Sequence, residues 1–154
     1  MKWHGLRILN AMKRVLFICV HNAGRSQMAE AFFNQLAGGR TLATSAGTSP
    51  ATGINPAVQQ AMLELGIDIS QQYPQKLTLA MLEEADRAIT MGCSEEQTCP
   101  ASLAPAEDWQ LDDPEGQPIE KVREIRDIIK TRVAKLIEEL NDTDIQQGKQ
   151  EVIP

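Results

Sequence analysis

The stretch that decides the fold is Val15-Leu-Phe-Ile-Cys-Val-His-Asn-Ala-Gly-Arg-Ser-Gln-Met-Ala-Glu30. Its unbroken apolar run up to Cys19 predicts a buried parallel strand, because such strands are covered on both faces. The polar segment that follows predicts a loop, and Ser26 is expected to cap the helix behind it. Apolar side chains then recur at helical spacing until Gly38 and Gly39 end the helix.

The same order of strand and helix recurs along the rest of the chain. The patterns predict a strand at 42–44, a helix opened by Asn55 and Pro56, a helix at 78–85, a strand at 87–91, a possible strand at 108–111 and a closing amphipathic helix from 119 to 140. Strands alternating with helices favour right-handed βαβ units. The expected fold class is therefore α/β, with one parallel sheet and helices on both faces.

The length and the net charge of the chain limit the number of domains and the kinds of partner that it can bind. A chain of 154 residues suggests a single domain, which we place at 13–140, with a flexible extension at 1–12 and a disordered tail at 141–154. The net charge of −6 argues against a protein that binds nucleic acid, because such proteins usually present a basic surface. The longest early apolar run is too short to cross a membrane, and no export signal is evident. We expect a cytoplasmic, monomeric protein.

Three chemically interesting segments meet at one edge of the predicted sheet. Cys19 ends the first strand, Gly92 and Cys93 follow the strand at 87–91, and Asp112 and Asp113 follow the possible strand at 108–111. Ligands of parallel sheets bind at the carboxyl ends of strands. An odd count of three cysteines, Cys19, Cys93 and Cys99, argues against a permanent disulfide framework and leaves catalysis, redox exchange or metal binding open.

The loop after Cys19 has the composition of an oxyanion-binding nest. Its backbone N–H groups and the N-terminus of the next helix can surround an anion. The predicted substrate-binding residues are Val20, His21, Asn22, Ala23, Gly24 and Arg25. Arg25 offers a planar fork for two oxygens of a tetrahedral anion. The same dipoles favour a thiolate at Cys19, to which Ser26 could donate a hydrogen bond. For His21 we expect the backbone to matter more than the ring.

At these residues the chain resembles the low-molecular-weight tyrosine phosphatase fold, and specifically the arsenate reductases built on it. Gln27 stands where the phosphatases usually carry proline, and Thr90-Met-Gly-Cys-Ser-Glu-Glu-Gln-Thr-Cys-Pro100 is similar to the redox segment of the reductases. The resemblance covers residues 13–140. It implies a four-stranded parallel sheet, a nucleophilic Cys19 and the reduction of arsenate to arsenite.

The resemblance also implies a relay of thiols. Cys19 would form a covalent adduct with arsenic, Cys93 would attack Cys19 and release arsenite, and Cys99 would attack Cys93. The resulting Cys93–Cys99 disulfide would need an external reductant, either thioredoxin or another redoxin, or a low-molecular-weight thiol. Asp113, directly before Pro114, matches the general acid of the family.

Some relatives bind a potassium ion, and Asn22, Glu30 and Ser45 match three of its ligands. The fourth position falls near Gln75 and Lys76, where no carboxylate is present and an ammonium lies close, so we predict no required metal or cofactor. Two other functions stay open. One is a tyrosine phosphatase that uses Cys19, Arg25 and Asp113, and the other is a binding protein that holds a soft metal through Cys19, His21, Cys93 and Cys99.

Overall fold

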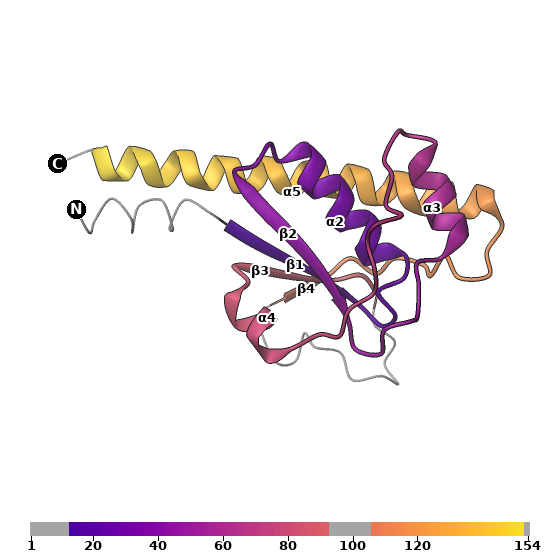
Figure 1. Ribbon diagram of the computed structural model, residues 1–154. Coiled ribbons are helices and arrows are strands. Elements are labelled where there is room, and N and C mark those ends of the chain that lie inside the picture. Colours follow the sequence, from indigo (N-terminus) through magenta and orange to yellow (C-terminus); the bar gives the residue numbers. More distant parts are fainter. Residues whose placement is uncertain (1–12, 93–105, 153–154) are drawn as a thin grey trace.

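The computed structural model describes residues 13–92 and 106–152 (Figure 1). Its elements are β1 (Lys13–Cys19), α2 (Arg25–Leu36), β2 (Thr41–Gly47), α3 (Pro56–Leu63), α4 (Leu79–Glu84), β3 (Arg87–Thr90), β4 (Ala106–Asp108) and α5 (Ile119–Val152). The extension predicted for residues 1–12 lies outside the described residues. No helix within the described ranges is long and apolar enough to cross a membrane.

The four strands form one parallel sheet in the order β2-β1-β3-β4, which confirms the predicted architecture. The chain leaves β1 toward β2 on one side and later returns to add β3 and β4 on the other. The order of the strands therefore reverses at β1, and ligands of open parallel sheets bind at such a point, beyond the carboxyl ends of the strands. Cys19 ends β1 at this point, level with Gly47 of β2.

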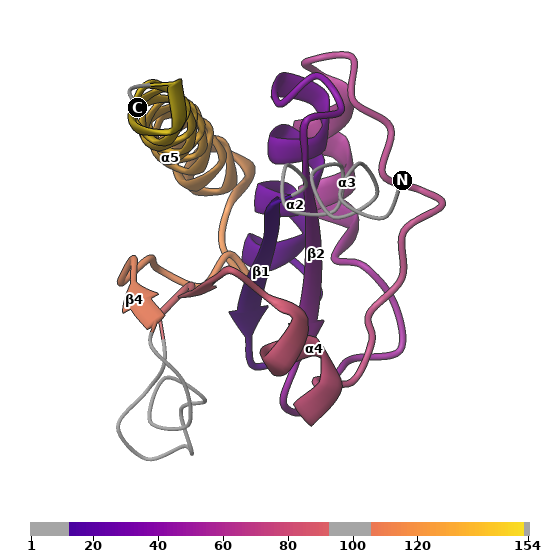
Figure 2. The same ribbon diagram turned by 90° about the vertical axis from the view of Figure 1, so that its left-hand side faces the viewer.

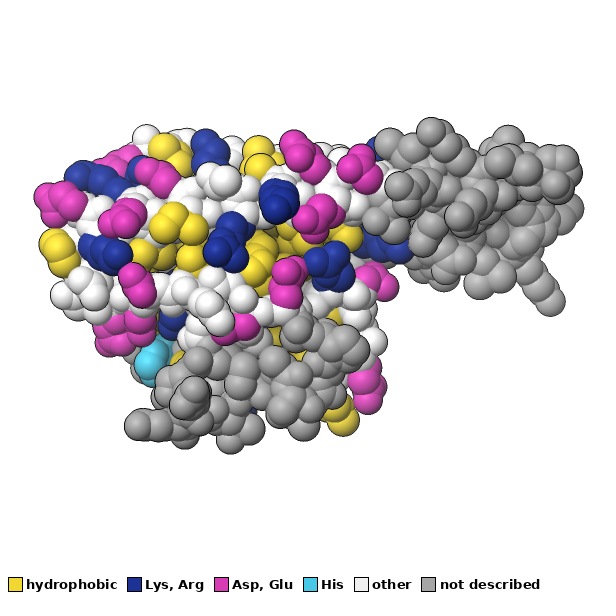
Figure 3. Space-filling view, turned by 180° about the vertical axis from the view of Figure 1, so that it is seen from behind, with side chains coloured by type: hydrophobic (Ala, Val, Ile, Leu, Met, Phe, Trp, Pro, Cys, Tyr) yellow, Lys and Arg dark blue, Asp and Glu magenta, His cyan; other side chains and the backbone are white. Residues whose placement is uncertain are grey.

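Helices cover both faces of the sheet, as the sequence predicts (Figure 2). The larger core lies between the sheet and α2, α3 and α5, and includes Phe17, Phe32 and Phe33, whose side chains are fully buried. On the other face a smaller cluster packs Leu16 and Ile18 against α4. Over the face along which α5 runs, basic and acidic side chains are interspersed (Figure 3).

Strand β2 is longer than the predicted 42–44, α4 and β3 are each slightly shorter than predicted, and three further elements differ from their predicted bounds. Helix α2 begins at Arg25, with Gly24 as its N-cap and no capping side chain, so Ser26 lies inside the helix, where its hydroxyl contacts Cys19 instead. Strand β4 spans Ala106–Asp108 rather than 108–111, because it pairs in register with β3. Helix α5 runs on to Val152 where we expected a disordered tail from residue 141, since no proline interrupts it there.

Candidate active site

The loop between β1 and α2 directs its carbonyl groups outward. The carbonyl oxygens of Cys19, Val20, His21 and Ala23 accept hydrogen bonds from the backbone N–H groups of Thr48, Ser49, Ala51 and Asn55, respectively, at 2.8 to 3.3 Å. In a trans peptide the C=O and the next N–H point in opposite directions. The N–H groups that follow these carbonyls therefore face the interior of the loop, the arrangement expected of an anion-binding nest.

The sulfur of Cys19 lies at the centre of this loop and is almost fully buried. The backbone N–H of Asn22 donates to Sγ over 3.1 Å, and the Ser26 hydroxyl lies 2.8 Å from it. Asn22 adopts a left-handed backbone conformation with φ of 52°, which turns its N–H back toward the sulfur. Donors directed at a sulfur stabilise the thiolate, the form that acts as a nucleophile.

Arg25 is buried at the first position of α2, and its two terminal nitrogens make different contacts. Nη1 donates to the carbonyl oxygens of Met91 and Leu111, over 3.0 and 2.8 Å, and so ties the ends of β3 and of the segment after β4 to the loop. Nη2 lies 3.7 Å from Oδ2 of Asp113. Nη1 is thus committed to the scaffold, and the binding of two anion oxygens by the Arg25 guanidinium stays a prediction.

A cavity of about 360 Å³ opens over the loop and is lined by several of the predicted residues, but not by Val20, Asn22 or Ser26. Its lining includes Cys19, His21, Arg25 and Asp113, together with small or aliphatic residues of the segment 51–56. Pro114 presses against Gly24, where an added Cβ would lie 2.9 Å from Pro114 Cγ. This contact places Asp113 and Pro114 beside the loop after Cys19, and the described residues that line the cavity include no Phe, Tyr or Trp.

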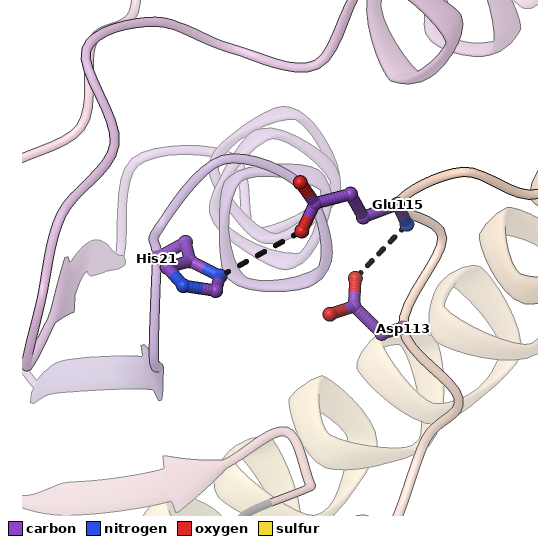
Figure 4. A group of neighbouring side chains, drawn as sticks. All are labelled: His21, Asp113 and Glu115. Carbon is purple, nitrogen blue, oxygen red and sulfur yellow. Dashed lines mark hydrogen bonds and ion pairs between the residues drawn. The ribbon is translucent and has the colours of Figure 1, made fainter.

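Three exposed side chains meet at the mouth of the cavity (Figure 4). His21 Nδ1 lies 4.0 Å from Glu115 Oε2, and Asp113 Oδ1 accepts a hydrogen bond from the Glu115 N–H over 3.0 Å. Ligand-type atoms of the three residues lie within 4.8 Å of one another. No sequence pattern predicted that His21, Asp113 and Glu115 lie together. Of the four residues predicted for a soft-metal site, Cys93 and Cys99 lie outside the described residues.

Asn22, Glu30 and Ser45, which match potassium ligands of some relatives, lie next to one another, but the atoms that they direct at one another do not suit a cation. Ser45 Oγ lies 3.0 Å from both Asn22 Nδ2 and Glu30 Oε1. The atom of Asn22 that faces Ser45 is thus an N–H donor, which cannot ligate a cation. The ammonium of Lys76 donates to the carbonyl oxygen of Thr48 over 2.9 Å. The prediction that no metal is required stays a prediction.

Burial raises the pKa of Glu30 above its usual range, and the hydrogen bond from Ser45 offsets only part of this effect. The folded protein consequently binds the Glu30 proton more tightly than the unfolded chain does. Its contribution to stability is present at acidic pH and is lost as the pH rises through the raised pKa. A glutamine at this position has no charge to desolvate and can still accept from Ser45.

We therefore expect Glu30→Gln to be more stable than the wild type at neutral pH, with a difference that shrinks as the pH falls toward the ordinary range of a carboxyl group. Free energies of unfolding in urea, measured for both proteins across this range, test the expectation. A difference that grows on acidification would contradict it.

Cys93 and Cys99 lie outside the described residues, so their predicted roles stay predictions. The backbone just before them is firmly held. Asp108 Oδ1 accepts from the Thr90 hydroxyl over 2.9 Å and from the Gly92 N–H over 2.8 Å. Sequence reasoning did not identify this function of Asp108, because a single acidic residue at a strand end carries no distinctive spacing.

The fold and the loop define the class of this protein: a single-domain α/β protein with a cysteine at the start of a loop whose carbonyl groups point outward. The family model described as "Low molecular weight phosphotyrosine protein phosphatase" matches residues 14–147. This chain belongs to that family.

Similar proteins point to the reductase branch. A "Putative arsenate reductase" of Halobacterium salinarum is 43% identical over 83% of this chain and 93% of its own length. A "Glutaredoxin arsenate reductase" of Synechocystis is 36% identical over 84% of this chain and all of its own length. Among solved structures, a thioredoxin-dependent arsenate reductase of Corynebacterium glutamicum matches with a TM-score of 0.71 at 35% identity, over 92% of this chain and 72% of that one.

Proposed function

We propose that this protein reduces arsenate to arsenite with electrons from an external thiol. The observation that carries the proposal is the buried Cys19 sulfur, which receives the Asn22 N–H and lies beside the Ser26 hydroxyl within a loop whose other N–H groups face inward. Such a nest accepts a tetrahedral oxyanion and presents it to a thiolate. The names of the similar proteins support arsenate as that oxyanion.

The first step joins sulfur to arsenic. The Cys19 thiolate attacks arsenate, one oxygen leaves as water, and Asp113 in its acid form supplies the proton. Asp113 lines the same cavity as Cys19, and its carboxylate lies beside Arg25 Nη2. Arg25 and the inward N–H groups hold the remaining oxygens, so the negative charge of the adduct is compensated.

The second step reduces arsenic by two electrons. The Cys93 thiolate attacks Cys19 Sγ, the sulfur–arsenic bond breaks, and its electron pair stays on arsenic, which leaves as arsenite. Cys99 then attacks Cys93 Sγ, which frees the Cys19 thiolate and leaves a Cys93–Cys99 disulfide. Two thiols are thus oxidised for each arsenate, and an external dithiol such as thioredoxin or glutaredoxin, or two molecules of a monothiol, restores them.

The activity test measures arsenite formation by the wild-type protein with a thioredoxin system, with a glutaredoxin system and with a monothiol alone, beside hydrolysis of an aryl phosphate. We expect arsenite with at least one thiol system. Aryl phosphate turnover without any arsenite would place the protein among the phosphatases. The described lining of the cavity includes no Phe, Tyr or Trp, which disfavours that result, because no benzene or indole ring is available there to stack on the aryl group.

The relay predicts a specific pattern in the cysteine variants. Cys93→Ser should stop turnover after the adduct forms, whereas Cys99→Ser should trap a Cys19–Cys93 disulfide after a single turnover. Mass spectrometry after peptide digestion, together with arsenite released in the first turnover, distinguishes the two. Full multiple-turnover activity in both variants would contradict the relay and assign release of arsenite to the external thiol.

A further inference from the structure

Gln27 is buried behind the loop and does not line the cavity, yet its side chain amide is fully engaged. Nε2 lies 3.0 Å from the backbone oxygen of Asn22, 3.0 Å from Asn22 Oδ1 and 3.1 Å from the backbone oxygen of Tyr73. Backbone oxygens can only accept hydrogen bonds. The atom that faces them must therefore be the nitrogen, so the orientation of the Gln27 amide follows from its neighbours.

The orientation of the Asn22 amide follows in the same way. The backbone N–H of Gln75, which can only donate, lies 2.9 Å from Asn22 Oδ1. With the oxygen on that side, Asn22 Nδ2 faces the hydroxyl groups of Ser26 and Ser45, at 2.7 and 3.0 Å. A reversed amide would set donors against both Gln75 N–H and Gln27 Nε2, which is unfavourable in a buried site.

The two N–H bonds of the Asn22 amide then decide how the hydroxyl protons point. Ser45 Oγ accepts one of them and gives its own proton to Glu30 Oε1, 3.0 Å away. Ser26 Oγ accepts the other, which leaves its single proton for Cys19 Sγ, 2.8 Å away. The chain of hydrogen bonds thus has one direction, from Gln27 through Asn22 and Ser26 to the nucleophile.

Gln72 completes the arrangement from the segment before β3. Its Nε2 donates to Gln27 Oε1 over 2.6 Å, so the one acceptor of the Gln27 side chain is also satisfied. We propose that Gln27, held by Gln72, is a positioning residue that orients Asn22 and Ser26 so that the Ser26 hydroxyl donates to Cys19 Sγ. It touches neither the oxyanion nor the sulfur, and it acts by stabilising the thiolate.

The test measures the pH dependence of Cys19 alkylation by iodoacetamide, in a background with Cys93→Ser and Cys99→Ser so that one thiol reacts. Gln27→Met keeps the volume and removes every hydrogen bond of the amide. We expect the pH of half-maximal alkylation rate to rise by about 0.5 to 1 unit, less than the roughly 1 to 2 units for complete loss of a hydrogen bond to the charged form, because Ser26 itself remains. Because alkylation needs no arsenate, this test is independent of the proposed function.

Combining Gln27→Met with Ser26→Ala separates positioning from general loosening. If Gln27 acts through Ser26, the rise in the double variant is smaller than the sum of the two single rises. Gln71→Met, an exposed neighbour of the same type, is the matched control and should leave the pH profile unchanged. A fully additive double variant would overturn the proposed route through Ser26.

A melting temperature for each variant shows whether the effect is only structural. A Gln27→Met protein that melts lower but keeps the wild-type pH profile would overturn the proposal. If Gln27→Met fails to fold, the partly buried Gln72→Met decides, since it leaves Gln27 in place and removes the donor that holds it. We expect a smaller rise in the same direction, and no rise would overturn the proposal.

Discussion

We expect Cys19→Ser to lose arsenate reduction by at least about 10⁴-fold while it still binds the oxyanion. A serine hydroxyl is a much weaker acid than a thiol, and the described hydrogen-bond partners of this position include no base to take its proton. Even an oxygen adduct of arsenic could not be resolved by Cys93, since no disulfide can form at that atom. Loss of the nucleophile therefore removes both steps of the reaction.

Binding should survive because the groups that hold the anion stay in place. The inward N–H groups and Arg25 do not depend on the sulfur, and a neutral hydroxyl repels a dianion less than a thiolate does. The measurement pairs arsenite formation with the rise in melting temperature on adding arsenate. An unchanged turnover, or loss of the arsenate-dependent rise in a folded variant, would contradict the assigned role of Cys19.

The fold could largely be predicted from the sequence because its main elements have strong periodic patterns. The buried strand ending at Cys19, the helix cap at Asn55 and the apolar positions of α5 up to Leu140 are local signals, and the structure confirms them. Ser26 shows where local reasoning is wrong. Serine is a common helix cap, but the Ser26 hydroxyl instead contacts Cys19 Sγ and Asn22 Nδ2 inside the site.

The site itself could be predicted only in part. Parallel topology alone brings Cys19, Arg25 and Asp113 to one edge of the sheet, and the structure places all three around one cavity. The link between Gln27 and Gln72 spans 45 positions in the sequence and has no fixed spacing, so no pattern predicts it. The direction of these hydrogen bonds depends on the Tyr73 carbonyl beside Gln27 and on the Gln75 N–H beside Asn22, which only folding brings into place.

The second large effect is expected at Gly92, which precedes Cys93. Gly92 has φ of +111°, and an added Cβ would lie 2.6 Å from the Leu111 oxygen and 2.9 Å from Arg25 Nη1. These two atoms form a hydrogen bond of 2.8 Å, so a methyl group there must push them apart. Gly92→Ala should lower the free energy of unfolding by about 2 to 4 kcal/mol through steric overlap and backbone strain.

Activity should fall as well, because the added methyl group displaces the Arg25 guanidinium from its position beside the loop after Cys19. A displacement of about 1 Å in a positioning group can lower turnover by about 10²-fold, and we expect a loss of that order for Gly92→Ala. The matched control is Gly39→Ala, at φ of +86° with no atom within 4 Å of the added Cβ. It should lower the free energy of unfolding by about 1 to 2 kcal/mol from backbone strain and leave turnover unchanged. Equal losses of stability and full activity in both variants would show that positive φ alone, and not the contact with Arg25, requires glycine at position 92.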